Sequence, residues 1–386
     1  MKILIGLVGR FHAVDICLGL LKSGHNVKIA TTIPKFVMKN YIDKKYIISY
    51  GLLGLINHFR FIFGNKLAQK INILTHELLS RFLINKTSKC DVIITWAGCS
   101  LELYKSKKLQ NNKILKILEC GSTHINHKIY TLKKLSLENN LKFNFNYDHA
   151  SRELEEYYMA DYIFVPSTFV KKTFLNNGIS SNKIFVNPYG VNSEIFYIDK
   201  TNNFKTKNTV LLFCGNASMR KGFHLLIDAS EHFSKMNVEI IHVGLISQEI
   251  KSYMKNKNIS SIKFLGKKKQ NELRRFYNLV DALILPSFEE GLSLVQLQSL
   301  ACGTPIISSL AAGVEDITRD TTLYLGETIK SVTKLNILES INLFLDNKQK
   351  VDRVAISNYC KKNFSIKSYS ERYLDKISKH NFENET

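Results

Sequence analysis

The feature that most constrains this chain is an alternation of apolar strands and amphipathic helices that begins at its first residues. The segment KILIGLV (2–8) has the unbroken apolar character of a buried strand, and a helical pattern over 13–22 follows the turn at 9–12. A second strand, NVKIATT (26–32), comes after the SGH that ends this helix. A strand, a helix and a strand in close succession predict a right-handed crossover between neighbours of a parallel sheet.

The same alternation returns in the second half of the chain. Predicted strands there cover 208–216, 238–244, 262–266, 281–287 and 304–309. The halves also resemble each other locally, because Asp161 begins DYIFVPS and Asp281 begins DALILPS. We therefore predict an α/β fold of two Rossmann-like parallel-sheet domains that face each other across a cleft.

The domain limits follow from changes in composition. A polar joint is predicted over 187–208. The predicted units are an N-terminal domain (1–192), a C-terminal domain (193–360) and a helical tail (361–386) that packs back toward the N-terminal domain.

The charge balance indicates anionic partners. Lysine and arginine number 54 against 33 aspartates and glutamates, which gives a formal net charge of +21. Such a charge attracts phosphorylated substrates, anionic membranes or nucleic acid. The basic residues are spread along the chain without a dense basic arm, so we expect no nucleic-acid partner.

The apolar residues and cysteines indicate a cytoplasmic protein. No stretch approaches the roughly 18 uninterrupted apolar residues of a membrane span, and the short apolar run at the N-terminus is unlike a signal peptide. The seven cysteines include no CxxC pair, and we expect reduced thiols in the core.

The stretch CGNASMRKGFHLL (214–226) is a candidate phosphate site. Arg220 and Lys221 lie between a strand end and a helix start, with Gly215 at the end of the strand. Two adjacent cations beside free backbone N–H groups can neutralise a diphosphate. The alternative is a pair of solvated surface charges.

The stretch PSFEEGLSLVQLQSLACG (286–303) is the second candidate. Glu290 can accept hydrogen bonds from sugar hydroxyls, Gly291 allows a ligand to approach the backbone, and the amides near Ser293–Val295 begin a helix. The alternative is an acidic pair that only complements the helix dipole. The helical spacing predicts that Leu294, Leu297 and Ala301 share an inward-facing side.

With these motifs, nearly the whole chain resembles a family 4 glycosyltransferase of the bacterial surface-glycan type. EEGLSLVQLQSLACGTPIISS is similar to the family's E-x7-E region, and FCGNASMRKGFHLLIDA resembles its phosphate loop. The segment ADYIFVPSTFVKKTFLNNGISSNKIFVNPYGVNSEIF is similar to the part that leads to the hinge. The resemblance implies the GT-B fold and a retaining enzyme that uses a nucleotide-diphosphate sugar.

The resemblance also implies roles for donor-binding residues. Lys221 would hold the donor diphosphate, Glu290 would contact the donor sugar as a catalytic residue, and the amides of Leu294 and Val295 would hold the distal phosphate.

The chain departs from the family pattern at two donor-site positions. The family's second glutamate, which binds ribose, is Gln298 here, and an amide still bonds a diol. The family's phosphate-loop arginine is Asn216, a change that Arg220 can compensate. Gly9, in the first strand–helix turn, is a further candidate donor contact.

The acceptor side is expected in the N-terminal half. ILECGSTHINHK (117–128) ends a predicted strand, and His124 best matches a family histidine that touches the donor sugar. Glu119 and His127 are lesser candidates, and a structural histidine is the alternative. The strand-ending turn 9–12 and TWAGCS (95–100) lie on the same predicted side.

In the mechanism that the resemblance implies, the leaving phosphate itself accepts the acceptor proton. The protein then stabilises the charge that develops on that phosphate. The chain contains no D-x-D triplet, so we expect neither a metal nor any cofactor beyond the nucleotide sugar.

The stretch 51–86 is rich in leucine, isoleucine, phenylalanine and basic residues. One interpretation is a basic amphipathic helix on an anionic membrane; the other is a core helix with outward lysines. The first would place the protein on the inner face of the cell membrane.

Together these features predict a retaining glycosyltransferase that moves a sugar to a hydroxyl acceptor, a glycolipid or surface-polysaccharide intermediate. Two alternatives stay open: a sugar-nucleotide 2-epimerase and a non-catalytic glycan- or nucleotide-binding protein, the latter because of Asn216 and Gln298.

Overall fold

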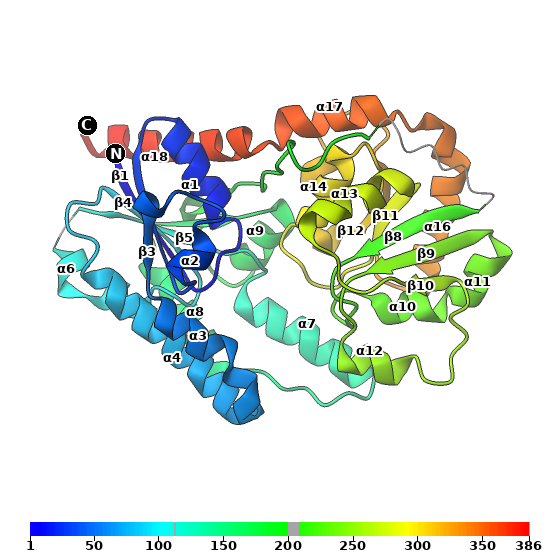
Figure 1. Cartoon of the computed structure of the whole chain (residues 1–386), viewed down its shortest axis with the longest axis horizontal. Helices are drawn as coiled ribbons and strands as arrows, with labels where there is room; N and C mark the ends of the chain where they lie inside the picture. The colour runs from blue at the N-terminus through cyan, green and yellow to red at the C-terminus, as the bar shows by residue number, and fades with distance from the viewer. Residues whose placement is uncertain (112, 200–207, 386) are drawn as a thin grey trace.

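The computed structural model describes residues 1–111, 113–199 and 208–385, and the described residues form two parallel sheets (Figure 1). The first sheet has the strand order β3-β2-β1-β4-β5-β6-β7, and the second has the order β10-β9-β8-β11-β12-β13. This arrangement confirms the predicted fold class. Of the joint predicted over 187–208, residues 200–207 lie outside the described residues.

The strands are short, and most of them lie in apolar runs of the sequence, β13 (GETI) being an exception. Those of the first sheet are β1 (Lys2–Leu7), β2 (Asn26–Thr31), β3 (Ile47–Ser49), β4 (Val92–Trp96), β5 (Leu115–Glu119), β6 (Tyr162–Val165) and β7 (Ile184–Val186). Those of the second are β8 (Thr209–Cys214), β9 (Val238–Val243), β10 (Ile262–Phe264), β11 (Ala282–Leu285), β12 (Ile306–Ser309) and β13 (Gly326–Ile329).

Helices connect the strands. Up to β7 these are α1 (Ala13–Lys22), α2 (Lys35–Met38), α3 (Gly51–His58), α4 (Asn65–Ile84), α5 (Leu101–Lys105), α6 (Lys107–Gln110), α7 (Ile125–Glu138), α8 (Tyr147–Met159) and α9 (Thr168–Leu175). After β8 they are α10 (Phe223–Asp228), α11 (Ser230–Lys235), α12 (Gln248–Tyr253), α13 (Gln270–Leu279), α14 (Leu294–Ala301), α15 (Glu315–Thr318), α16 (Lys334–Asn347), α17 (Arg353–Asn363) and α18 (Ile366–Glu385). Short 3-10 turns are η1 (Lys44–Tyr46), η2 (Arg60–Phe63), η3 (Ser181–Lys183), η4 (Leu310–Ala312) and η5 (Lys348–Lys350).

The similarity between the two halves has a structural cause. Asp161 precedes β6, and its carboxylate accepts the N–H of Lys116 on β5 at 2.8 Å. Asp281 precedes β11 and accepts the N–H of Val210 on β8 at 2.7 Å. Each aspartate satisfies the donor at the start of the neighbouring strand, where the sheet ladder leaves a buried N–H without a partner.

The C-terminal helix returns to the first sheet. Figure 1 shows α17 above the second sheet and α18 beside α1. A Cβ atom on Gly19 of α1 would lie 2.3 Å from Ser370 Oγ, so the two helices pack closely. Tyr369, Tyr373 and Ile377 of α18 are fully buried, and the Tyr373 ring stacks on Phe164 of β6 with the ring centroids 4.4 Å apart. The end of the chain therefore contributes side chains to the N-terminal core.

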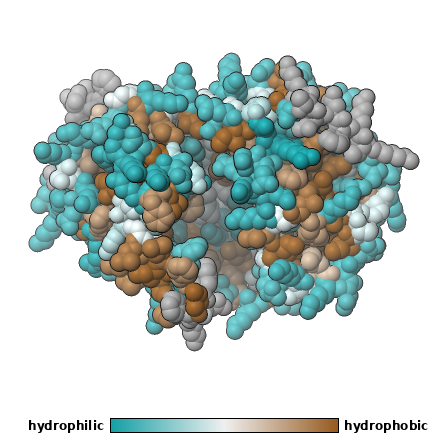
Figure 2. Space-filling model, in the orientation of Figure 1, coloured by the Kyte–Doolittle hydropathy of each residue, from teal (hydrophilic) through white to brown (hydrophobic). Residues whose placement is uncertain are grey.

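The segment 51–86 is two helices rather than one. Gly64 has a φ of +78°, a left-handed conformation that suits glycine and separates α3 and η2 from α4. The second half of α4 packs inward, with Leu79 fully buried, while Leu52 and Ile62 are 70% and 74% exposed. Apolar side chains appear over α3 and α4 at the lower left of Figure 2. Among the described residues, no helix has the length and apolar character needed to span a bilayer.

The cysteines are free thiols, as predicted. All seven are unpaired, and six of them are buried. Burial raises the pKa of Cys17 and Cys302 to about 12, so both stay protonated at neutral pH.

Candidate active site

A cavity of about 530 Å³ lies between the carboxyl end of the first sheet and the start of α14. Val8, Trp96 and Cys120, at the ends of β1, β4 and β5, contribute to one wall. Glu290 and Ser293, which follow β11, contribute to the other. Ligands of open α/β sheets bind at this edge. We call this space the cleft cavity.

The loop after β8 holds its lysine over the backbone. A Cβ atom on Gly215 would lie 3.4 Å from Lys221 Nζ, so the ammonium group lies close to the end of β8. Gly222 has a φ of +70°, and a Cβ there would lie 2.0 Å from the carbonyl oxygen of Pro286. Only glycine fits this contact, which presses the loop against the end of β11.

Both cations of this loop lie against Glu290. Its Oε2 atom is 3.1 Å from Lys221 Nζ and 3.5 Å from Arg220 Nη1. These two ion pairs link the loop to the carboxylate that follows β11. The side chain of Lys221 is only 12% exposed, so Lys221 is not the solvated surface charge of the alternative interpretation. Arg220 and Lys221 are thus next to Glu290, which lines the cleft cavity.

The neighbouring carboxylate, Glu289, joins the two halves of the molecule. It is fully buried and accepts hydrogen bonds from Ser122 Oγ at 2.6 Å and Thr123 Oγ1 at 2.8 Å. Arg220 donates to its backbone carbonyl at 2.7 Å. Burial by itself would raise the pKa of Glu289, but the charges of Lys128 and Arg220 and these hydroxyl bonds outweigh burial and lower that pKa. Glu289 is therefore a charged link between the domains.

The start of α14 faces the cleft cavity. Ser293, Leu294 and Val295 line it, and the first N–H groups of a helix have no carbonyl partner within that helix. A Cβ atom on Gly291 would lie 2.1 Å from the carbonyl oxygen of Gly121, so the two domains touch backbone to backbone here.

The predicted inward face of α14 packs on the core, and its first residue also reaches the cleft. Leu297 and Ala301 are buried as expected. Leu294 is only partly buried, because as the first residue of the helix it lies at the cleft and lines its cavity.

Of the predicted donor-binding residues, Ser293, Leu294 and Val295 line the cleft cavity, and seven others are not among its lining residues: Gly9, Gly215, Asn216, Arg220, Lys221, Gly291 and Gln298. Gln298 lines a neighbouring cavity of about 430 Å³, and its amide oxygen accepts a hydrogen bond from Tyr277 at 2.8 Å. Asn216 is exposed. Gly9 has a φ of +87°, and its N–H donates to Thr32 Oγ1 at 3.1 Å, which fixes the first turn. Their donor roles stay predictions.

His124 is a helix cap in the structure. Its Nδ1 atom accepts the N–H of Asn126 at 3.3 Å at the start of α7, and its ring lies 5.0 Å from Tyr157 and 5.1 Å from Phe174. The residue is 1% exposed and is not among the residues that line the cleft cavity. Burial lowers its pKa to about 4, so the imidazole is neutral. The catalytic role of His124 stays a prediction.

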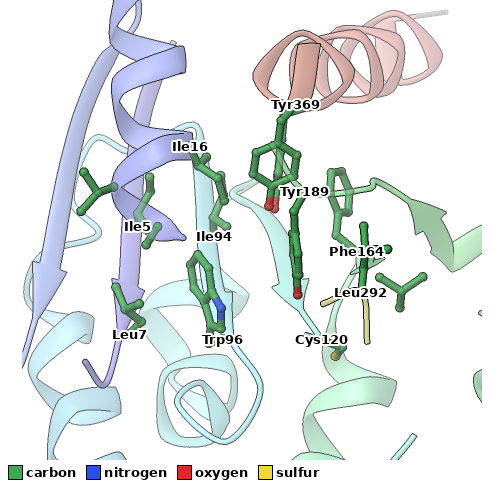
Figure 3. Close-up of a cluster of buried hydrophobic side chains, with 14 of the residues drawn as sticks. Ile5, Leu7, Ile16, Ile94, Trp96, Cys120, Phe164, Tyr189, Leu292 and Tyr369 are labelled. Atoms are coloured by element: carbon green, nitrogen blue, oxygen red, sulfur yellow. The ribbon is translucent and has the colours of Figure 1, made fainter. Parts of the chain in front are cut away.

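Sequence reasoning missed a different histidine. His12 lines both the cleft cavity and the neighbouring one, and its Nε2 atom lies 3.6 Å from the carboxylate of Glu119. Its ring centroid is 4.1 Å from that of Tyr189 and 5.2 Å from that of Trp96. Figure 3 shows Trp96 opposite Tyr189, with Tyr369 descending from α18. The sequence did contain a signal for His12: the turns at 9–12 and 95–100 follow strands whose ends lie on the same side of the sheet as Glu119.

His127, the other lesser candidate, is partly exposed on α7. Burial lowers its pKa, and its ring packs against Phe169 at 6.0 Å.

Known glycosyltransferases match parts of this chain. Residues 195–362 match the model of glycosyl transferases group 1, and this range contains Arg220, Lys221 and Glu290. An uncharacterized glycosyltransferase of Methanocaldococcus jannaschii is 32% identical over 139 residues, which is 36% of this chain. That alignment spans only 38% of the relative's own length.

Solved structures match over the whole chain. A sucrose-phosphate synthase of Thermosynechococcus elongatus superposes with a TM-score of 0.73 at 16% identity and covers 99% of both chains. Anabaena HepE, solved with UDP-glucose, superposes with a TM-score of 0.66 at 15% identity and covers 98% of this chain and 100% of its own. The chain therefore has the GT-B fold, with a second half that matches the glycosyl transferases group 1 model.

Proposed function

We propose that this protein is a retaining family 4 glycosyltransferase that moves a sugar from a nucleotide-diphosphate sugar to a hydroxyl acceptor. The observation that carries the proposal is the convergence of Lys221 and Arg220 on Glu290, beside the first amides of α14 and facing the N-terminal domain. Anabaena HepE, which shares the fold, binds UDP-glucose.

In this proposal the second domain binds the donor. Lys221 and the N–H groups of Leu294 and Val295 bind the diphosphate, because a cation and unpaired helix amides both favour an anion. Arg220 adds a second charge next to Lys221. When the phosphate binds, it takes over the cations that now pair with Glu290, and the carboxylate turns to the donor sugar in the cleft cavity.

The same groups account for catalysis. As the glycosidic bond breaks, negative charge grows on the leaving phosphate, and preorganised cations and amides stabilise that charge without reorganising. The acceptor oxygen bonds to the anomeric carbon on the face that the phosphate leaves, and the departing phosphate takes the proton of that hydroxyl, so the configuration is retained. The two cations already supply positive charge, and we propose that no metal ion is needed. Activity in excess EDTA would support this part.

The acceptor in this proposal is a glycolipid or a surface-polysaccharide intermediate at a membrane. The outward face of α3, η2 and the start of α4 supports it, because Leu52, Phe59 and Ile62 are all more than half exposed. The net charge of +21 would hold this face against an anionic bilayer.

The first experiment is a thermal-shift screen against UDP, GDP and ADP sugars, followed by assays of nucleotide release. A transferase releases the nucleotide diphosphate slowly from the donor alone and faster when acceptor is added. NMR of the product then reports the anomeric configuration. Release without any acceptor dependence would indicate the epimerase alternative, and binding without release would indicate a non-catalytic protein.

A further inference from the structure

A second cavity, of about 550 Å³, opens beside the cleft cavity inside the N-terminal domain. Three residues line both spaces: Lys128 of α7 and His149 and Glu153 of α8. The two cavities therefore share a wall, and a molecule in the second cavity can extend a group toward Glu290. We call this second space the side cavity.

The acidic group on the shared wall is already bonded within the protein. Glu153 Oε1 lies 3.3 Å from His149 Nδ1, and Glu153 Oε2 accepts a hydrogen bond from Tyr157 at 2.7 Å. The His149 ring is held in turn against Gly98, where a Cβ atom would lie 2.5 Å from the ring. Both oxygens of this carboxylate are thus directed to protein groups.

Lys128 is the basic group of the shared wall. Among the described residues, none places a carboxylate oxygen within 4.0 Å of its Nζ atom. Its charge nevertheless lowers the pKa of Glu153 and of Glu289, although it forms no ion pair within 4.0 Å with either carboxylate. Each of those carboxylates is satisfied by other donors. The ammonium group is therefore available to an anion from outside.

The rest of the side cavity combines apolar side chains, Ala68, Ile125 and Phe145, with polar ones, and its described lining residues include no carboxylate besides Glu153. Gln69 and Asn72 of α4 and Asn144 before α8 contribute amide groups, and Arg60 of η2 adds a second positive charge. Amide side chains donate to phosphate oxygens and bond sugar hydroxyls equally well. The volume exceeds that of a single phosphate group and has room for a polyol or sugar attached to it.

We propose that the side cavity is the acceptor subsite and that it recognises a phosphate-bearing polyol or sugar, with Lys128 as the cation that holds the phosphate. This inference rests on the proposed function, because it assumes that the cleft cavity holds the donor sugar. The acceptor hydroxyl enters the cleft past His149 and Glu153, while the phosphate stays behind at Lys128. The phosphate belongs to a soluble sugar phosphate or to a lipid headgroup. The lipid headgroup is a candidate because Arg60 lies on the same segment as Phe59 and Ile62, whose apolar side chains are exposed.

The test measures binding, so it needs no knowledge of the donor sugar. The probe is sn-glycerol 3-phosphate, titrated calorimetrically into the full chain with saturating UDP, which blocks the donor cations. We expect saturable binding that weakens tenfold or more in Lys128→Met. Lys133→Met is the matched control, because Lys133 is an exposed lysine on the same helix. It should stay within twofold of the unaltered chain.

Two results would overturn the proposal: no saturable binding to the unaltered chain, or equal affinity in Lys128→Met and Lys133→Met. If Lys128→Met does not fold, Gln69→Glu gives a second route, because a carboxylate at this wall repels phosphate. Gln69→Glu should weaken binding at least as much as Lys128→Met, and unchanged affinity would contradict the subsite.

A vesicle arm distinguishes the two sources of phosphate. Vesicles of phosphatidylcholine with phosphatidic acid are mixed with the same two lysine variants, which carry equal net charge. Weaker binding of Lys128→Met than of Lys133→Met supports a lipid headgroup, and equal vesicle binding together with Lys128-dependent glycerol phosphate binding supports a soluble acceptor.

The acceptor subsite can be tested separately from the proposed donor function. If UDP does not bind the unaltered chain, the nucleotide-donor proposal fails. The phosphate titration is then repeated in a Lys221→Ala background, where Lys128-dependent binding still reports on the side cavity.

Discussion

The Nζ atom of Lys221 lies 3.1 Å from the Oε2 atom of Glu290, although the two residues are 69 positions apart in the sequence. The pair links a basic group suited to phosphate with an acidic group suited to sugar hydroxyls. Substitution of Lys221 and substitution of Glu290 should therefore affect two different steps of the proposed reaction.

Lys221→Ala is expected to weaken binding of nucleotide diphosphates by roughly 1.5–3 kcal/mol, the value of a hydrogen bond to a charged group. Calorimetric titration with UDP, or with the nucleotide found in the donor screen, measures this loss. Lys235→Ala, which removes an exposed lysine of the same domain, is the control. Equal affinity in the two variants would contradict the phosphate role of Lys221.

Glu290→Gln is expected to lower kcat about 10–100-fold, because the amide bonds a sugar hydroxyl more weakly than a carboxylate does and each 1.4 kcal/mol is a factor of ten. Nucleotide binding should persist, since the phosphate no longer competes with a carboxylate for Lys221 and Arg220. Steady-state kinetics beside UDP titration separates these effects. An unchanged kcat in Glu290→Gln would contradict the proposed contact between Glu290 and the donor sugar.

Glu289→Gln should reduce the free energy of unfolding by about 1–3 kcal/mol at pH 7, a modest value because Arg220 is one-third exposed. The folded-state pKa of Glu289 lies below its usual 4.5. Its charge therefore stabilises the fold above pH 4.5, and this contribution is lost as the pH falls through the lower, folded-state pKa.

Urea unfolding of the original chain and of Glu289→Gln at several pH values measures this contribution. The difference between the two should shrink as the pH falls below 4.5. Glu339→Gln, at an exposed glutamate of α16, supplies the baseline. A difference that stays constant down to the acid limit would show that Glu289 acts by packing alone.

For His124, two substitutions separate a cap from a catalytic group. Asparagine is a good N-cap residue, so His124→Asn should keep both stability and turnover, while His124→Ala should lose about 1 kcal/mol of stability. Thermal unfolding and kinetics of both variants decide the matter. Loss of turnover in a stable His124→Asn protein would restore the catalytic role that the sequence predicts.

The apolar face of α3 and η2 predicts membrane binding. Leu52→Asp with Ile62→Asp should lower partitioning onto vesicles containing phosphatidylglycerol by roughly tenfold or more, since each buried aliphatic side chain contributes about 1.5–3 kcal/mol. Leu335→Asp is a matched control, because Leu335 is 74% exposed on α16 of the other domain. Sedimentation with vesicles gives the comparison, and equal loss in the control would show a general effect of charge.

Several features of this protein were predictable because they depend on neighbours in sequence. The alternation of strands with helices and the helix over 13–22 follow from local periodicity, and the structure has α1 at these residues. The link of Lys221 and Arg220 to Glu290 was also within reach, because both segments directly follow strands that pair in one sheet, β8 and β11. Parallel strands bring their carboxyl ends to the same edge.

Other features depended on side-chain direction, which periodicity does not specify. Local sequence placed His124 and His12 equally well at strand ends, yet one caps α7 and the other lines the cleft cavity. Likewise Leu294 lies on the inward stripe of α14 by spacing but borders the cavity, because a helix begins at the cleft rather than in the core.

The sequence by itself determined the two parallel sheets and the cationic loop beside a helix start, since hydrogen-bonding and hydrophobic periods act over a few residues. Only the tertiary structure decided that Glu289 would reach across to Ser122, that Tyr369 would come from the last helix to the wall beside Glu119, and that Lys128 would border two cavities. These contacts join segments far apart in the chain, so no pattern over a few neighbouring residues specifies them.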